Sequence, residues 1–191
     1  MTDSGGFLTE SETAVLTAAV DRLVPPDGEH PGAAALGAVD YIRGLLDAFA
    51  SDPPRIWAGG PYSDRAGSPV NHFLEFMPLS KLDVLAWRTR IEGSRGIPER
   101  EFNGPVVGWQ VRYRLGLAGL GDDFTRLHGT AQDTRLDAQP DFRQLLYEHT
   151  CEGCYAAPEY GGNRATRGWQ AIGFPGDVQP RGYSDVEVRD P

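Results

Sequence analysis

The sequence predicts a mainly α-helical fold: a small, irregular helical domain with long loops and an extended Gly/Pro-rich C-terminal arm. Three observations predict it. Apolar residues recur at helical spacing in several segments, each behind residues that favour a helix start. The pattern of strands alternating with helices that marks a βαβ fold is missing. Glycine and proline, 24 and 15 of the 191 residues, interrupt the helical segments so often that long ordered loops are expected between them.

Two helices are expected near the N-terminus. Thr9 and Glu12 have the spacing of a capping box, and the apolar residues behind them recur at helical period until a Pro-Pro pair ends the segment at residue 25. A turn-rich link follows. A second helix is expected over about 34–50, because its apolar residues fall on a single stripe.

The middle of the chain mixes loops and helices. Residues 51–71 are rich in Pro and Gly and are expected to form a long loop. Ser80 is suited to cap a helix that runs to about Ile91 and carries apolar residues on both sides, so we expect burial on more than one face. The stretch 105–117 alternates like a strand in part, but its context favours a helix. A last helix is expected from about Pro140.

The chain is expected to divide into a helical domain, 1–154, and an irregular arm, 155–191. Large apolar side chains, among them Tyr160, Trp169 and Phe174, occur in this arm without any periodicity. Such groups either pack back onto the helices or anchor a second protein, since aromatic residues are enriched at protein interfaces. Composition alone leaves both alternatives open.

Composition narrows the classes of partner. The formal net charge of −9 argues against nucleic acid and against an anionic membrane surface. No segment approaches the roughly 20 apolar residues that a membrane-spanning helix needs, so no membrane insertion is expected. The first residues lack a basic segment, a hydrophobic segment and a twin arginine. The sequence as written is therefore expected to be cytoplasmic, with a periplasmic or exported location as the alternative if a partner carries it or a signal was removed.

Sequence motifs for catalysis are missing, and we expect no catalytic residue, no metal site and no cofactor in this chain. The four histidines form no HExxH pair, and neither a GxSxG elbow nor a GxGxxG turn is present. The one cluster that invites chemistry is His149, Cys151 and Cys154. It offers three of the four ligands that structural zinc needs, and Tyr155 stands where a c-type haem motif has histidine. Two small buried side chains, a local disulfide, and an independent thiol-redox or metal-binding function remain alternatives.

The C-terminal segment carries a specific set of residues: His149-Thr150-x-Glu152-Gly153, then Pro158-x-Tyr160-Gly161-Gly162-Asn163, then Gly168-Trp169-x-x-Ile172-Gly173-Phe174-Pro175-Gly176. This string resembles the gluconate 2-dehydrogenase subunit 3 family. The N-terminal strings Arg22-Leu23-Val24-Pro25-x-Asp27, Pro31-Gly32-Ala33 and Val39-Asp40-Tyr41-Ile42 are similar to it too. The stretch from about 95 to 140 carries no part of the resemblance.

The resemblance implies a non-catalytic small subunit of an FAD-dependent sugar, glycoside or alcohol dehydrogenase. Its partner would be a large GMC-type flavoprotein that holds FAD and, in several systems, an iron–sulfur cluster. The small subunit would stabilise or assemble that partner, or act as an export chaperone that leaves afterwards. The residues expected at the partner interface are His149, Glu152, Tyr160, Gly161, Gly162, Asn163, Arg164, Trp169, Phe174 and Pro175. The chain departs from the family pattern at Cys151 and Cys154, and in lacking a twin-arginine signal.

Overall fold

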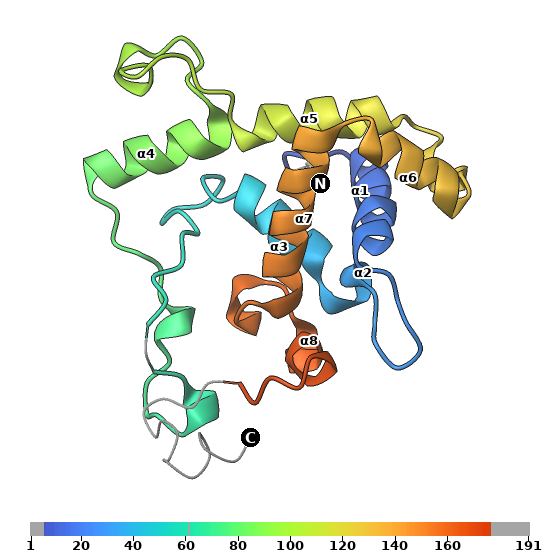
Figure 1. The fold of residues 1–191 in the computed structure, drawn as a ribbon. Helices are drawn as coiled ribbons and strands as arrows, with labels where there is room; N and C mark the ends of the chain where they lie inside the picture. The colour runs from blue at the N-terminus through green and yellow to red at the C-terminus, as the bar shows by residue number, and fades with distance from the viewer. Residues whose placement is uncertain (1–5, 61, 177–191) are drawn as a thin grey trace, which may run out of the picture.

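The computed structural model describes residues 6–60 and 62–176, and within those ranges the fold is helical. Eight α-helices and six short 3₁₀ helices are present there, with no β-strand, which confirms the mainly α prediction (Figure 1). The α-helices are α1 Glu10–Leu23, α2 Ala33–Leu36, α3 Ala38–Leu46, α4 Lys81–Glu92, α5 Trp109–Leu120, α6 Gly129–Asp137, α7 Pro140–Tyr155 and α8 Arg167–Ala171. None of the helices described is both long and apolar enough to cross a membrane.

The first helix begins at the capping box that the sequence predicts. The Thr9 hydroxyl accepts a hydrogen bond from the backbone N–H of Glu12 at 3.2 Å, and the Glu12 carboxylate accepts one from the backbone N–H of Thr9 at 2.8 Å. These two bonds satisfy donors that a helix start otherwise leaves without partners. The apolar side of α1, with Leu16 and Val20, is fully buried.

The prediction of one helix over 34–50 is wrong, because Gly37 divides it into α2 and α3. Gly37 has φ of +95°, a left-handed conformation that ends α2 and that an L-residue adopts only at a cost in free energy. The helix then restarts in a new direction and ends at Leu46. A side chain at Gly37 would also press on Gly162 and Arg164, so the break between α2 and α3 is where these helices meet the segment after α7.

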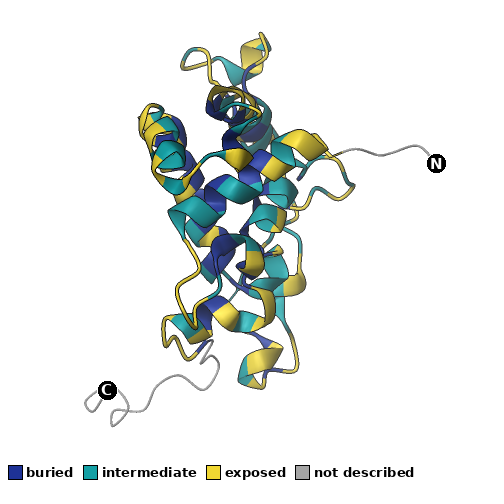
Figure 2. Ribbon diagram, turned by 90° about the vertical axis from the view of Figure 1, so that its right-hand side faces the viewer, coloured by how far each residue is buried: buried dark blue, intermediate teal, exposed yellow. Residues whose placement is uncertain are grey.

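The core lies where α3 and α7 pack against each other at the centre of the molecule, with α1, α2, α5 and α6 around them (Figure 1). Figure 2 shows the buried residues concentrated along these helices. The buried apolar side chains of this core include Leu16, Val20, Leu36, Ile42, Leu46, Tyr113, Leu117, Leu120, Phe124, Leu136, Phe142, Leu145 and Leu146.

The prediction that the helix after Ser80 is buried on more than one face is wrong. Its start is correct, since Ser80 forms a capping box with Asp83. Yet α4 extends from α5 to one side of the body (Figure 1), Ile91 is its one buried residue, and Leu82 is 72% exposed. Apolar residues on two sides of a helix predict that a neighbouring element packs on each side. In the described part of the chain, such packing covers little more than one side of α4.

The remaining predictions hold in outline. The strand-like stretch after residue 105 is helical, as α5, and the last helix starts at Pro140. Residues 51–71 form a loop that contains one short 3₁₀ helix, Asp64–Ala66. The helix α6 was not predicted, because Leu136 is its single buried residue and leaves no apolar period to detect.

Candidate partner-binding site

The segment after α7 is fastened to the end of that helix by Asn163. This residue is fully buried and has a left-handed backbone conformation. Its side-chain amide donates to the carbonyl of Ala156 at 2.9 Å, and its amide oxygen accepts from the N–H of Gly168 at 2.9 Å. Its backbone N–H donates to the carbonyl of Gly153 at 2.7 Å. Asn163 therefore joins the last turn of α7 to the start of α8.

Three glycines let backbones approach each other at this junction. A Cβ atom on Gly162 would lie well under 3.0 Å from the carbonyl oxygen of Gly153, and one on Gly168 equally close to that of Cys154. A Cβ on Gly153 would lie 2.7 Å from the Cα of Ala38, at the start of α3. All these neighbours are backbone atoms, which move less readily than side chains. These three glycines of the motif are thus explained by packing within the chain.

Trp169 closes the junction from α8. It is 7% exposed, and its indole N–H donates to the carbonyl of Tyr155 at 2.7 Å. The ring packs edge-to-face on Phe174 at 5.3 Å between centroids, and the guanidinium of Arg65 lies over it at 5.3 Å. Of the two alternatives that the sequence leaves open for this residue, the structure shows packing back onto the chain's own helices.

His149 lies inside the molecule, 3% exposed, among aromatic rings. Its Nδ1 is 3.0 Å from the hydroxyl of Tyr113, and its ring meets Trp109 edge-on at 4.9 Å between centroids. Burial disfavours the charged imidazolium and lowers the pKa of His149 to about 4. The imidazole is therefore neutral at pH 7 and is not presented to a partner.

This buried imidazole predicts that stability falls between pH 7 and pH 5. The folded pKa of about 4 lies below the ordinary value of 6.5, so the unfolded chain binds more protons in this range. His149 should therefore remove about 2 kcal/mol of unfolding free energy as the pH falls from 7 to 5. Urea unfolding at both pH values measures the change. In His149→Gln most of the change should vanish, and an equal fall in that variant would contradict the assignment.

The other residues expected at the interface lie at or near the surface of the same region. Glu152, Gly161 and Arg164 are exposed, as are Phe174 and Pro175. Arg164 forms an ion pair with Asp40 of α3, and the hydroxyl of Tyr41 donates to Glu152 at 2.8 Å. The motif thus contains two kinds of residue: those that hold the arm in place, and those whose side chains are exposed at the surface.

Sequence reasoning places His149, Gly162, Asn163 and Trp169 at the interface, and the structure places all four inside the chain. Gly162, Asn163 and Trp169 hold the arm against α7. His149 instead packs against two aromatic residues of α5. The described part of the arm, 156–176, contains two 3₁₀ helices and α8 and packs on α7 and α3. Its last part, 177–191, lies outside the described residues. Whether the arm contacts a partner stays a prediction.

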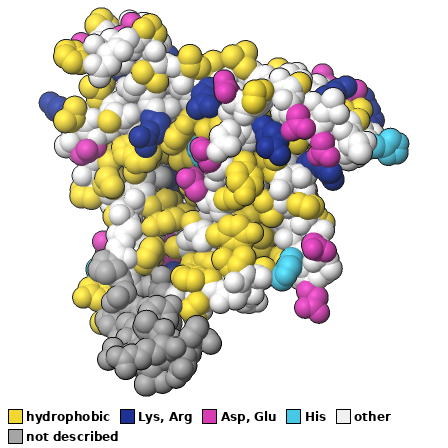
Figure 3. Space-filling view, viewed as in Figure 1, with side chains coloured by type: hydrophobic (Ala, Val, Ile, Leu, Met, Phe, Trp, Pro, Cys, Tyr) yellow, Lys and Arg dark blue, Asp and Glu magenta, His cyan; other side chains and the backbone are white. Residues whose placement is uncertain are grey.

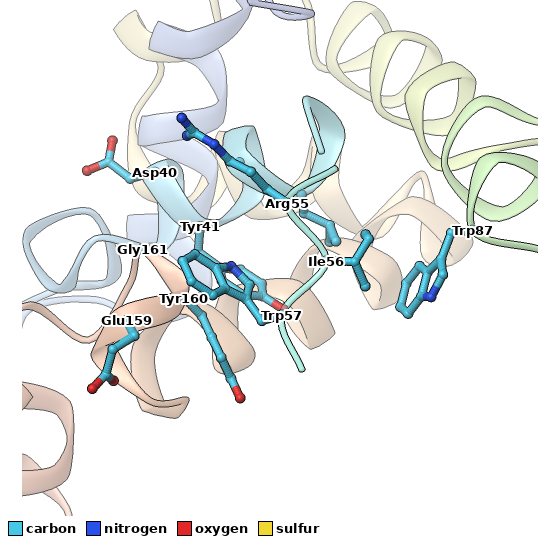
Figure 4. Close-up of a pocket in the computed structure, with 11 residues that line it drawn as sticks. Asp40, Tyr41, Arg55, Ile56, Trp57, Trp87, Glu159, Tyr160 and Gly161 are labelled. Carbon is cyan, nitrogen blue, oxygen red and sulfur yellow. The ribbon is translucent and has the colours of Figure 1, made fainter. Parts of the chain in front are cut away.

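Beside the arm lies a cavity of about 590 Å³ with aromatic walls (Figure 4). Its walls come from α3, from the segment after it, from α4 and from the turn before Gly162. Figure 3 shows the surface hollowed between the helical body and the segment that follows α3. The lining residues are Asp40, Tyr41, Gly44, Leu45, Arg55, Ile56, Trp57, Trp87, Glu159, Tyr160 and Gly161. Two of the expected interface residues, Tyr160 and Gly161, therefore belong to this cavity.

Trp57 forms the rigid centre of the cavity wall. Its ring packs on Phe76 at 4.6 Å and on Tyr160 at 5.8 Å between centroids. Nearby, burial opposes ionisation of Glu159, but hydrogen bonds from Asn71 and Arg65 outweigh it and hold the pKa of that carboxyl below its usual value. Sequence reasoning missed Trp57, since it stands in a loop without periodicity. An aromatic residue in a Gly/Pro-rich loop was the one available signal.

The cluster His149, Cys151 and Cys154 is not brought together as a site. Residues two apart on a helix do not face each other, so His149 and Cys151 point from different sides of α7. Both cysteines are free, and burial raises the pKa of Cys154 to about 12, which keeps it a thiol at pH 7. Within the described ranges, no three His, Cys, Asp or Glu side chains are placed to hold a metal ion.

Comparison with known proteins identifies one family. No curated protein and no solved structure matches this chain. The model of the gluconate 2-dehydrogenase subunit 3 family matches residues 10–176, which include every helix described above and the whole junction at Asn163. The chain therefore belongs to the gluconate 2-dehydrogenase subunit 3 family.

Proposed function

We propose that this chain is the non-catalytic small subunit of an FAD-dependent dehydrogenase that oxidises a CH–OH group of a sugar, glycoside or alcohol. It stabilises or assembles the large GMC-type flavoprotein subunit. The observation that carries the proposal is the family match over residues 10–176, whose name describes a subunit of a dehydrogenase. FAD, and an iron–sulfur cluster in those complexes that contain one, belongs to the large subunit in this proposal.

The arrangement of the arm supports a role in binding another protein. Internal hydrogen bonds and close backbone contacts fix the arm, and an aromatic cavity lies beside it. The exposed Arg164 pairs with Asp40 of the cavity wall, and Phe174 is exposed elsewhere on the arm. Aromatic and arginine side chains on a rigid support are typical of the residues that dominate binding energy at interfaces. Among the side chains around the cavity, the Tyr41 hydroxyl donates to Glu152, but burial and that carboxylate raise the pKa of Tyr41, so the pair does not supply a phenolate nucleophile at pH 7.

Co-expression tests the proposal. The large dehydrogenase subunit proposed as the partner is tagged and produced with and without this chain, in the presence of FAD. We expect the two chains to co-purify at a fixed ratio, and the large subunit alone to lose yield or flavin content. A large subunit that is equally soluble, flavin-loaded and active by itself, with no affinity for this chain, would overturn the proposal.

The alternative, an independent thiol-redox or metal-binding protein, rests on Cys151 and Cys154. Replacing both by alanine tests it, since alanine avoids placing a hydroxyl at the buried position of Cys154. We expect the doubly substituted chain to support the same dehydrogenase activity as the natural one, assayed in the co-purified complex. Loss of activity in a complex that still assembles would favour the alternative.

A further inference from the structure

The helix α5 has apolar residues on two opposite faces. Its inner face, with Tyr113, Leu117 and Leu120, belongs to the core. Its outer face carries Val111, 43% exposed, and Leu115, 68% exposed. A helix that is apolar on opposite sides is characteristic of an element buried between two layers, and here the second layer is missing from the described chain.

The outer apolar residues form a continuous row, which we call the outer stripe: Val107, Val111, Leu115 and Ala118. The last three stand at i, i+4 and i+7, which places them on one side of the helix. Val107, 61% exposed, extends the row before the first turn. In Figure 1 α5 lies along one edge of the molecule with the helical body on one side of it, and α8 lies at the opposite end.

The charges beside the outer stripe are positive. The twelve residues of α5 include two arginines and no carboxylate, in a chain whose net charge is −9. Arg112 donates to a backbone carbonyl, that of Asp141, at 3.3 Å. Arg114 lies over the ring of Phe7 at 4.4 Å, and its guanidinium is 3.9 Å from the carboxylate of Glu12. At this distance on the surface, the ion pair with Glu12 contributes little free energy. Arg114 also donates to the carbonyl of Phe7 at 3.1 Å. Both arginines thus have partners within the chain, and the side chain of Arg114 remains 56% exposed beside the stripe.

These features together select the kind of partner. A second copy of this chain would add two more arginines and no carboxylate from its own α5, so self-association through the stripe is disfavoured by like charge. An anionic membrane is disfavoured by the net charge of −9. An apolar groove with an acidic rim on a different protein complements both the row and its flanks.

We propose that the outer stripe of α5 docks into an apolar groove with an acidic rim on the large dehydrogenase subunit. The inference rests on the proposed function, because it takes that subunit as the partner. It assigns the contact to a helix outside the C-terminal motif, within the range that the family model matches. The row presents its side chains at the spacing of a helix that lies in a groove, with Leu115 as the central anchor.

The test compares the natural chain with three variants. Each is co-expressed with the tagged large subunit, and the purified chains are then measured for binding to that subunit by interferometry. Leu115→Lys disrupts the stripe and keeps a good helix former at an exposed position. Leu74→Lys is the matched control, at a leucine of 59% exposure in the loop before α4. The double variant Arg112→Gln with Arg114→Gln removes the basic flanks. Circular dichroism and thermal unfolding verify that each variant folds.

We expect Leu115→Lys to raise the dissociation constant about tenfold or more. Leu74→Lys should leave the dissociation constant within about twofold of that of the natural chain. The double arginine variant should bind more weakly at low salt and lose most of its dependence on ionic strength. If the natural chain and Leu115→Lys bind equally well, the outer stripe is not the contact and the proposed function still stands.

If the natural chain shows no binding to the large subunit, both proposals fail. Sedimentation of the natural chain and its binding to vesicles of phosphatidylserine and phosphatidylcholine then identify what the stripe contacts. A dimer, or vesicle binding, that Leu115→Lys abolishes would replace the dehydrogenase subunit as the occupant and overturn the inference.

Discussion

Replacing Gly162 by alanine is expected to lower the unfolding free energy by about 3 kcal/mol or more, since the added Cβ has no room. Its nearest neighbours are the carbonyl oxygen, carbonyl carbon and Cα of Gly153, all backbone atoms of α7. Relief requires the arm to move away from α7, which would break the 2.7 Å hydrogen bond between Asn163 and Gly153. Chemical denaturation followed by circular dichroism measures the loss.

The control for this experiment is Gly44→Ala. Gly44 lies within α3, and a Cβ there meets no atom within 4 Å. Because alanine favours helix over glycine, this change should leave stability unchanged or raise it by up to about 1 kcal/mol. Equal effects at Gly44 and Gly162 would show that backbone contact between the arm and α7 contributes nothing to stability.

Replacing Trp169 by alanine is expected to cost on the order of 3–5 kcal/mol, the usual range for loss of a large buried aromatic residue. The change removes the ring that packs against Phe174 and leaves the carbonyl of Tyr155 without its indole donor. The arm should then open more often than the helical body. Limited proteolysis should therefore cut the variant first within 156–176, before global unfolding is detected.

Trp169→Phe separates the two contributions of this side chain. It keeps a smaller apolar ring in the site but removes the hydrogen bond to Tyr155 and part of the packed indole volume, so a loss of about 1–3 kcal/mol, smaller than that for alanine, is expected. If Trp169→Ala has the same unfolding free energy and the same cleavage pattern as the natural chain, the arm is not held by this residue. The order of the two variants, alanine worse than phenylalanine, is the critical result.

Much of the fold was predictable because it depends on local signals. The capping residues Thr9 and Ser80 mark two helix starts, and a proline marks a third, at Pro140. The break at Gly37 was not predictable in the same way. A glycine within an apolar stripe is compatible with a continuous helix, and only the contact with Gly162, far along the sequence, shows why the chain turns there.

The candidate site was predicted in part, for a related reason. The C-terminal motif identifies the correct segment. Residue type alone, however, does not distinguish a glycine that allows close contact with a partner protein from one that allows close contact with the chain's own backbone. Gly162 and Gly168 are of the second kind. The cavity beside Tyr160 was missed because Trp57 and Trp87 reach it from separate segments, and a set of walls assembled from distant parts of the chain leaves no pattern in the sequence.

The origin of the cavity walls has a consequence for biosynthesis. Tyr41 and Trp57 leave the ribosome early, whereas Tyr160 and Gly161 are among the last of the described residues to be made, and Asn163 must follow them before the arm is fastened. A nascent or prematurely terminated chain therefore possesses the helices but not the complete cavity. Any protein that binds at this cavity would therefore discriminate against copies synthesised only as far as α7, so assembly would wait until the segment through Asn163 has been made.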